Sequence, residues 1–184
     1  MPMKHIIRPV IITALILLIP LFVNHRVEGW NWTGSDFAFA AVILFGFSLA
    51  YELIARKGGS MAYKAAVGVA VFAAFILTWG NLAVGFIGED NPANLFYFAI
   101  PLIGLVGASL SRFQPRGMAK TLFVMAAVQM IIPAVAYVVF RPDFAPGVIG
   151  VFGLSIAFAL LFVGSAVLFQ HAARQGALPT ERLA

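Results

Sequence analysis

Residues 78–97 read TWGNLAVGFIGEDNPANLFY. This stretch holds the densest group of polar and acidic side chains in a chain that is otherwise almost continuously apolar. Asn91 followed by Pro92 is typical of a helix N-cap and the first helical position. Gly88 suits the residue just beyond the end of a preceding helix. The stretch therefore predicts the turn of a helical hairpin with two acidic residues at its tip.

Composition places the whole chain in a lipid bilayer. Of its 184 residues, 62% are hydrophobic and only 10% are charged, and the mean hydropathy is +0.98. These values lie far outside those of soluble proteins. The net charge of +5 falls in short clusters between apolar runs, which is typical of membrane topology, so we expect no nucleic-acid partner. With no cysteine, the chain has no disulfide, thiolate metal ligand or thiol nucleophile.

The apolar runs predict an all-α, polytopic membrane protein with six transmembrane helices and no soluble domain. We interpret the first run as an uncleaved signal anchor, because no small-residue cleavage site follows it; without it, five spans would remain. The chain is then a single transmembrane domain, with spans at approximately 6–23, 37–55, 65–87, 95–110, 121–140 and 144–169.

The charges between these spans predict the orientation. The face that holds both termini carries ten cations against Glu52 and Glu181, and the opposite face carries two, Arg26 and Arg141, against five acids. This bias predicts that both termini are cytoplasmic. The ten cations are Lys4, Arg8, Arg56, Lys57, Lys64, Arg112, Arg116, Lys120, Arg174 and Arg182, and the five acids are Glu28, Asp36, Glu89, Asp90 and Asp143.

Two interpretations of the hairpin stay open. Capping and topology alone account for Asn91, Pro92 and the two acids. A functional interpretation adds a face of the third helix, because Thr78, Asn81, Gly85 and Gly88 recur at helical spacing below the acids. Such a polar groove would open outward and hold a cation, a proton relay, a polar headgroup or a protein partner. The candidate ligand- or partner-binding residues are Thr78, Asn81, Glu89, Asp90, Asn94 and Gln129, and we expect a cysteine at Asn94 to react from outside.

Two polar residues inside other spans have structural alternatives. Glu52 has Arg56 four residues later, which predicts a structural ion pair on one helix. Gln129 is predicted either to bond a neighbouring helix or to line a pore. Pro133, one turn further on, would free a backbone carbonyl close to Gln129.

Small residues at helical spacing predict close helix packing. Gly104 and Ala108 form such a pair in the fourth span. In the sixth span the series is Gly147, Gly150, Gly153 and Ala157. Packing of this kind fits contacts within a monomer and contacts between copies.

The run NLAVGFIGEDNPANL at 81–95, with LAYEL at 49–53 and RGMA at 116–119, resembles a group of small uncharacterised bacterial inner-membrane proteins. The likeness covers the second to fifth spans. It implies a bacterial cytoplasmic membrane, and it transfers no catalytic or binding residues.

The sequence favours a non-enzymatic accessory or scaffold membrane subunit, whose hairpin and close-packing helices meet a membrane-protein partner or a second copy. The alternative is a small cation or proton transporter or channel, with an outward-facing site at the hairpin of the third and fourth helices. No ionisable group is predicted at mid-depth, which favours the first. No nucleophile–base pair or metal-ligand motif occurs, so no catalytic or metal-binding residue is expected. His5, His25 and His171 lie at boundaries or in loops, so no cofactor is expected either.

Overall fold

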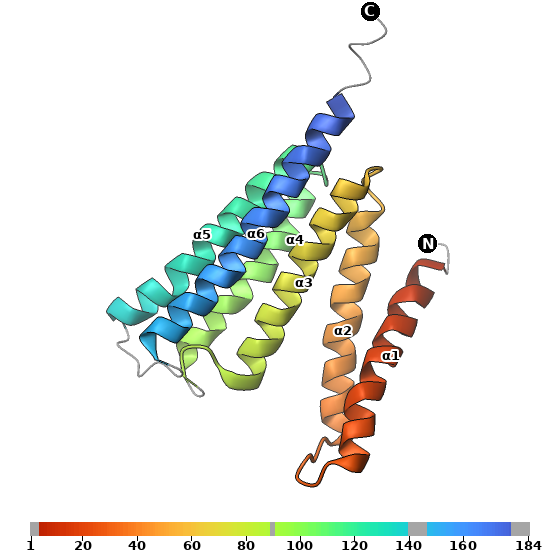
Figure 1. Cartoon of the computed structure of the whole chain (residues 1–184), viewed down its shortest axis with the longest axis vertical. Coiled ribbons are helices and arrows are strands. Elements are labelled where there is room, and N and C mark those ends of the chain that lie inside the picture. The colour runs from red at the N-terminus through yellow and green to blue at the C-terminus, as the bar shows by residue number, and fades with distance from the viewer. Residues whose placement is uncertain (1–3, 89–90, 140–146, 178–184) are drawn as a thin grey trace, which may run out of the picture. The chain divides into compact units, whose positions relative to one another are not determined.

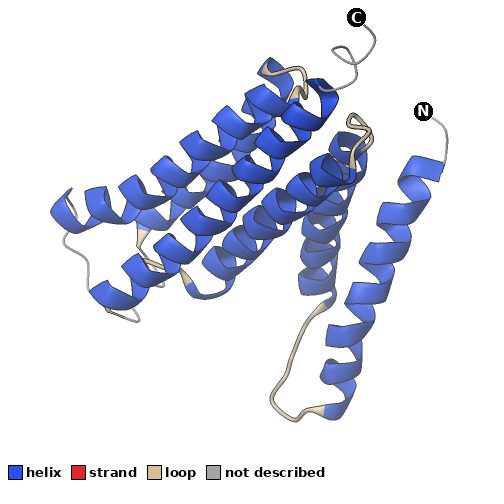
Figure 2. Ribbon diagram, turned by 45° about the horizontal axis from the view of Figure 1, so that its top comes forward, coloured by secondary structure: helices blue, strands red, loops and turns tan. Residues whose placement is uncertain are grey.

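All regular structure in the described part of the chain is helical (Figure 2), as the sequence predicts. The computed structural model describes residues 4–88, 91–139 and 147–177. Its elements are α1 (Lys4–Arg26), α2 (Gly34–Ala55), α3 (Met61–Val84), the short 3-10 helix η1 (Pro92–Phe98), α4 (Ala99–Leu110), α5 (Pro115–Val139) and α6 (Val148–Ala177).

Six segments of the described chain are long and apolar enough to cross a bilayer, with η1 and α4 together forming the fourth. The protein is therefore a multi-pass integral membrane protein. The segments are Ile6–Arg26, Gly34–Ala55, Met61–Val84, Pro92–Leu110, Pro115–Val139 and Val148–Gly176.

Polar side chains at the helix starts explain where several helices begin. At α2, the Asp36 carboxylate accepts hydrogen bonds from the Thr33 N–H and hydroxyl, both at 2.7 Å. At α3, the Ser60 hydroxyl oxygen accepts from the Tyr63 N–H at 3.2 Å. These bonds satisfy donors that the first turn of a helix leaves unpaired.

The chain forms two compact units, where the sequence predicted one transmembrane domain. The first, Met1–Arg56, is called the hairpin unit, and the second, Lys57–Ala184, is called the bundle unit. In the hairpin unit α1 packs on α2 through a narrow stripe that includes the buried Pro9 and Thr13.

In the bundle unit, α6 lies between α3 and α5, and α4, behind α6 in this view, also packs against α5 (Figure 1). The helices α3 and α4 hardly touch each other. Instead η1 contacts α3, α4 and α5, so it fills the space where α3 and α4 separate.

Small and polar residues bring the helices of the bundle close together. A Cβ added at Gly104 would lie 3.2 Å from the Met125 sulfur, and one at Gly107 would overlap Thr121, so α4 approaches α5 closely. The buried Ser165 hydroxyl donates to the Ala66 carbonyl oxygen at 2.7 Å, which ties α6 to α3. Gly147 precedes α6 with a φ of 97°, so it does not share the helical face of Gly153 and Ala157 that the sequence predicted.

The third helix ends three residues earlier than the sequence predicted. It ends at Val84, and Gly85 follows with a φ of 58°, which only glycine adopts freely. Gly88 also has a positive φ, of 128°. The chain turns back at Gly85 because this buries the side chains of Phe86 and Ile87. Gly85 and Gly88 could each follow the last residue of the helix. The helix ends before Gly85 because Phe86 and Ile87 are then buried.

Candidate functional site

Two asparagine side chains join the end of α3 to η1. The Asn81 Nδ2 donates to the Asn94 carbonyl oxygen at 2.9 Å. The Asn94 side chain in turn accepts from the Ile87 N–H at 2.9 Å and donates to the Gly88 carbonyl oxygen at 2.6 Å. These bonds satisfy backbone groups that a non-helical segment at the end of a membrane span would otherwise leave unpaired. The network therefore stabilises the turn of the hairpin.

The start of η1 matches the sequence prediction. Asn91 is the N-cap, its side-chain oxygen accepts from the Ala93 N–H at 2.9 Å, and Pro92 is in the first helical turn. Proline lacks only an N–H that would be unpaired there. The predicted capping role of Asn91 and Pro92 is confirmed.

Asn94 does not lie at the opening of an outward-facing groove. It is 9% exposed, and both ends of its amide are bonded to backbone groups. The expectation that a cysteine at this position reacts from outside is therefore not supported, because the side chain is turned into the hairpin. η1 makes this possible, since it folds Asn94 back towards Ile87 and Gly88.

The predicted polar face of the third helix is only partly assembled. Thr78 donates to the Ala74 carbonyl oxygen of its own helix at 2.7 Å, and Asn81 is buried. Gly85 and Gly88 lie beyond the end of α3, so they do not continue this face. The remaining predicted site residues of the hairpin, Glu89 and Asp90, lie outside the described residues.

Three buried polar atoms of the bundle have no hydrogen-bond partner among the described residues: Asn81 Oδ1, Tyr97 OH and Gln129 Oε1. They come from α3, η1 and α5, and the buried Ser155 of α6 lies near Tyr97. An unpaired buried polar atom in a native structure calls for an explanation, and an ordered water is the commonest one. Each of these four elements thus contributes at least one polar side chain to the core.

Gln129 has one acceptor without a partner among the described residues and a second that lacks its usual helical donor. Its side chain is 1% exposed, and Oε1 has no partner in the described chain. Its backbone carbonyl loses the usual helical donor as well, because Pro133 stands four residues later in α5 and has no N–H. The predicted interhelical bond is therefore not made by Oε1, and the site accepts hydrogen bonds only from a group that would have to enter it.

Glu52 has an ion-pair partner on the neighbouring helix. Its Oε1 lies 3.9 Å from an Arg8 guanidinium nitrogen, within the hairpin unit. The pair joins α1 to α2. The predicted pair of Glu52 with Arg56 stays a prediction.

The described core offers amide, hydroxyl and phenol groups for hydrogen bonding. Its buried side chains include Asn, Gln, Ser, Thr and Tyr but no carboxylate, histidine or lysine. No cluster of potential metal ligands occurs among the described residues. This arrangement can order water or orient a polar group.

Sequence reasoning missed Tyr97 and Ser155 as buried polar residues, and treated Arg116 only as a topology signal. Spacing between sequence-distant residues carries no signal for the first two. For Arg116, the Gln-Pro-Arg sequence at the start of α5 is a signal that could have been used, because it places a cation in the first turn of a helix.

Comparisons with protein-family models, with curated proteins and with solved structures found no match to this chain. The resemblance to small bacterial inner-membrane proteins stays a prediction. Function is therefore argued from the geometry of the chain itself.

Proposed function

We propose that the protein is a non-enzymatic subunit or scaffold of a bacterial inner membrane that binds a membrane-protein partner or a second copy of itself through α6. The observation that carries this proposal is a face of α6 that the described residues of the bundle unit leave uncovered. We call it the open α6 face, and it consists of Gly153, Ala157, Leu160, Gly164 and Val167.

The open α6 face has the spacing of a helix–helix seam. Its residues alternate at intervals of four and three, which is the heptad spacing at which two helices stay in contact as they supercoil. All five are exposed, and a Cβ added at Gly153 or Gly164 would meet nothing within 4 Å. Small residues alternating with Leu160 and Val167 let a second helix come close and interlock, which is how helices associate in lipid.

The glycines of α4 provide the contrast. Met125 and Thr121 of α5 pack directly against Gly104 and Gly107. The small-residue face of α4 is therefore already covered within the bundle. The equivalent feature on α6 has no such neighbour. This supports a role for α6 in binding another helix.

The chemistry of the core supports a non-enzymatic role. The buried side chains of the described core include no carboxylate, histidine or lysine, so its hydroxyl groups have no such base beside them to form a nucleophile–base pair. The charge bias of the whole sequence supports cytoplasmic termini, because the cations gather on the face that holds them.

Site-specific photo-cross-linking in intact membranes tests the proposal. A photoreactive residue at Leu160, which is 63% exposed on the open α6 face, should give one discrete protein adduct. The matched control is Leu102 on α4, which is 60% exposed and should give only lipid adducts. Equal labelling of protein from both positions, or none from Leu160, would contradict a binding role for this face.

A specific observation favours a second candidate, a small proton or cation path. The unpaired acceptors at Asn81 and Gln129, with the Tyr97 hydroxyl, are groups that could support a file of water in the core. Proteoliposomes of the wild type would then conduct protons or a monovalent cation, and Gln129→Leu would abolish the flux while the protein stays folded. Wild-type protein without flux would eliminate this candidate and leave the first untouched.

A further inference from the structure

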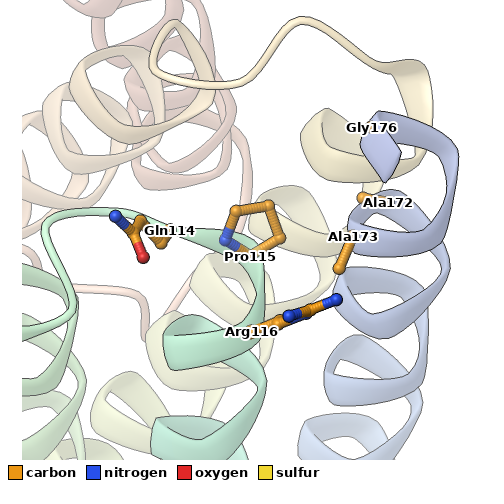
Figure 3. Close-up of a pocket in the computed structure, with 6 residues that line it drawn as sticks. All are labelled: Gln114, Pro115, Arg116, Ala172, Ala173 and Gly176. Carbon is orange, nitrogen blue, oxygen red and sulfur yellow. The ribbon is translucent and has the colours of Figure 1, made fainter. Parts of the chain in front are cut away.

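We propose that the pocket between the first turn of α5 and the last turns of α6 binds the phosphate of an anionic phospholipid headgroup. Figure 3 shows the six residues of its wall, and the pocket is open with a volume of about 240 Å³. The wall consists of Gln114, Pro115, Arg116, Ala172, Ala173 and Gly176.

The pocket lies at the depth of the headgroups. The membrane-crossing segment of α5 begins at Pro115, and that of α6 ends at Gly176. Both residues line the pocket, so it opens where the hydrocarbon core gives way to the polar interface. A ligand there can place a charged group in the pocket and its acyl chains alongside the bundle.

The wall supplies one strong phosphate ligand and space beside it. The Arg116 side chain extends from α5 towards Ala173 on α6 (Figure 3). A guanidinium presents paired donors that match phosphate oxygens. Opposite it stand Ala172, Ala173 and Gly176, whose side chains are too small to fill the space.

Within the described residues of the bundle unit, no carboxylate competes for this arginine. The described residues of the bundle unit contain no aspartate or glutamate. All six of their lysines and arginines lie near one end, where α3 and α5 begin and α4 and α6 end. They are Lys57, Lys64, Arg112, Arg116, Lys120 and Arg174. This end therefore attracts an anionic leaflet, and each cation near such a surface adds to the attraction.

The rim of the pocket is held in place by contacts outside it. The Tyr63 hydroxyl donates to the Phe113 carbonyl oxygen at 2.9 Å, and the Lys57 ammonium lies 5.5 Å from the centre of the Phe113 ring. The Gln114 carbonyl oxygen accepts from the Met118 N–H at 2.9 Å, which starts α5. The start of α5, which carries Arg116, is thus tied to α3.

The test uses the full chain in neutral detergent, titrated with lipid and followed by native mass spectrometry. Phosphatidylglycerol and phosphatidylcholine with the same acyl chains are compared, and we expect phosphatidylglycerol to bind about tenfold more tightly. Arg116→Gln should remove this preference. Lys64→Gln makes the same change of charge at the same end of the bundle, outside the pocket, and should keep it.

Two further measurements complete the test. One is a second pocket variant, in case Arg116→Gln misfolds, and the other identifies the source of the phosphate. Ala173→Leu fills the pocket without changing any charge, and it should also weaken phosphatidylglycerol binding. Inorganic phosphate and glycerol 3-phosphate at millimolar concentration should not displace the lipid. No preference in the wild type, equal losses in Arg116→Gln and Lys64→Gln, or displacement by free phosphate would overturn the assignment to a lipid headgroup.

Discussion

The hairpin unit and the bundle unit close their turns with the same device, an asparagine side chain that holds a backbone segment through both ends of its amide. In the hairpin unit, Asn24 accepts from the Trp32 N–H at 2.9 Å and donates to the Trp32 carbonyl oxygen at 3.3 Å. In the bundle unit, Asn94 accepts from Ile87 and donates to Gly88. Both bonds of Asn24 are half-buried, whereas Asn94 has a buried bond to Ile87 and a half-buried bond to Gly88, so water replaces the Asn24 bonds more readily than the bond to Ile87.

The helices of the bundle unit are also more buried than those of the hairpin unit. Of the 18 most apolar consecutive residues, 11% are buried in each of α1 and α2, against 33% in α3, 39% in α5 and 33% in α6. The hairpin helices depend on their general hydrophobicity, which any bilayer satisfies. The bundle helices depend on particular neighbours. Substitutions should therefore have larger effects in the bundle unit than matched substitutions in the hairpin unit.

The largest difference is expected between Asn94→Ala and Asn24→Ala. Loss of Asn94 leaves the buried Ile87 N–H and the half-buried Gly88 carbonyl unpaired, which should lower the free energy of unfolding of the bundle by roughly 2 to 4 kcal/mol. Loss of Asn24 should lower that of the hairpin unit by about 1 kcal/mol or less, because water reaches the turn. Denaturation with SDS in mixed micelles measures both, with fluorescence of Trp79 reporting on the bundle unit and that of Trp30 and Trp32 on the hairpin unit. Equal losses of unfolding free energy in the two variants would contradict the predicted difference between the two units.

The second largest difference is expected when a helical glycine of each unit is replaced by leucine. At Gly107 the new side chain would overlap Thr121, and the separation of α4 from α5 should lower the free energy of unfolding by about 1 to 3 kcal/mol. At Gly46 on α2 an added Cβ meets nothing within 4 Å, and the expected change is within about 0.5 kcal/mol. The same SDS titration measures both variants. A large loss at Gly46 would mean that a neighbour covers α2 at this position.

Ser165→Ala tests a buried tie between helices of the bundle. Removal of its bond to the Ala66 carbonyl should lower the free energy of unfolding by about 0.6 kcal/mol, as is usual for such bonds in membranes. Ser109→Ala is the control, because its hydroxyl bonds the Leu105 carbonyl of its own exposed turn. No difference between the two variants in thermal unfolding would show that the α6–α3 bond adds nothing.

The smallest effect is expected for the tie between the helices of the hairpin unit. Arg8→Gln removes the ion pair with Glu52, in which the Arg8 side chain is 75% exposed and the Glu52 side chain 16%. The loss should be about 0.5 kcal/mol at low salt and vanish at high salt, since exposed pairs are weak and screened. Unfolding titrations at two salt concentrations measure it. A loss above that of Ser165→Ala would reverse the predicted ranking of the two units.

Features that depend on local sequence were predictable. The six spans follow from the lengths of the apolar runs, and the cap at Asn91 follows from two adjacent residues. The end of α3 was not predictable from local sequence. Gly85 and Gly88 are both typical of the residue after a helix, and the burial of Phe86 and Ile87 decides between them.

Features that join distant residues were not predictable either. Asn94 lies beside acids and a proline, which is typical of an exposed turn, and only its contacts with Ile87 and Gly88 show that it is buried. One partner of Glu52, Arg8, comes from α1, and no local spacing indicates it. Likewise, the pocket between α5 and α6 requires these two helices to meet, which no stretch of sequence records.

The proposal that α6 binds another protein is tested most directly by the mass of the complex that the protein forms in its membrane. Membranes would be extracted with styrene–maleic acid copolymer, without detergent, and analysed by native mass spectrometry. For the wild type we predict a protein mass well above the 19.8 kDa of one chain, and for Gly164→Leu, a substitution with open space around it, the mass of a single chain. A wild type that is recovered as a single chain would contradict the proposal.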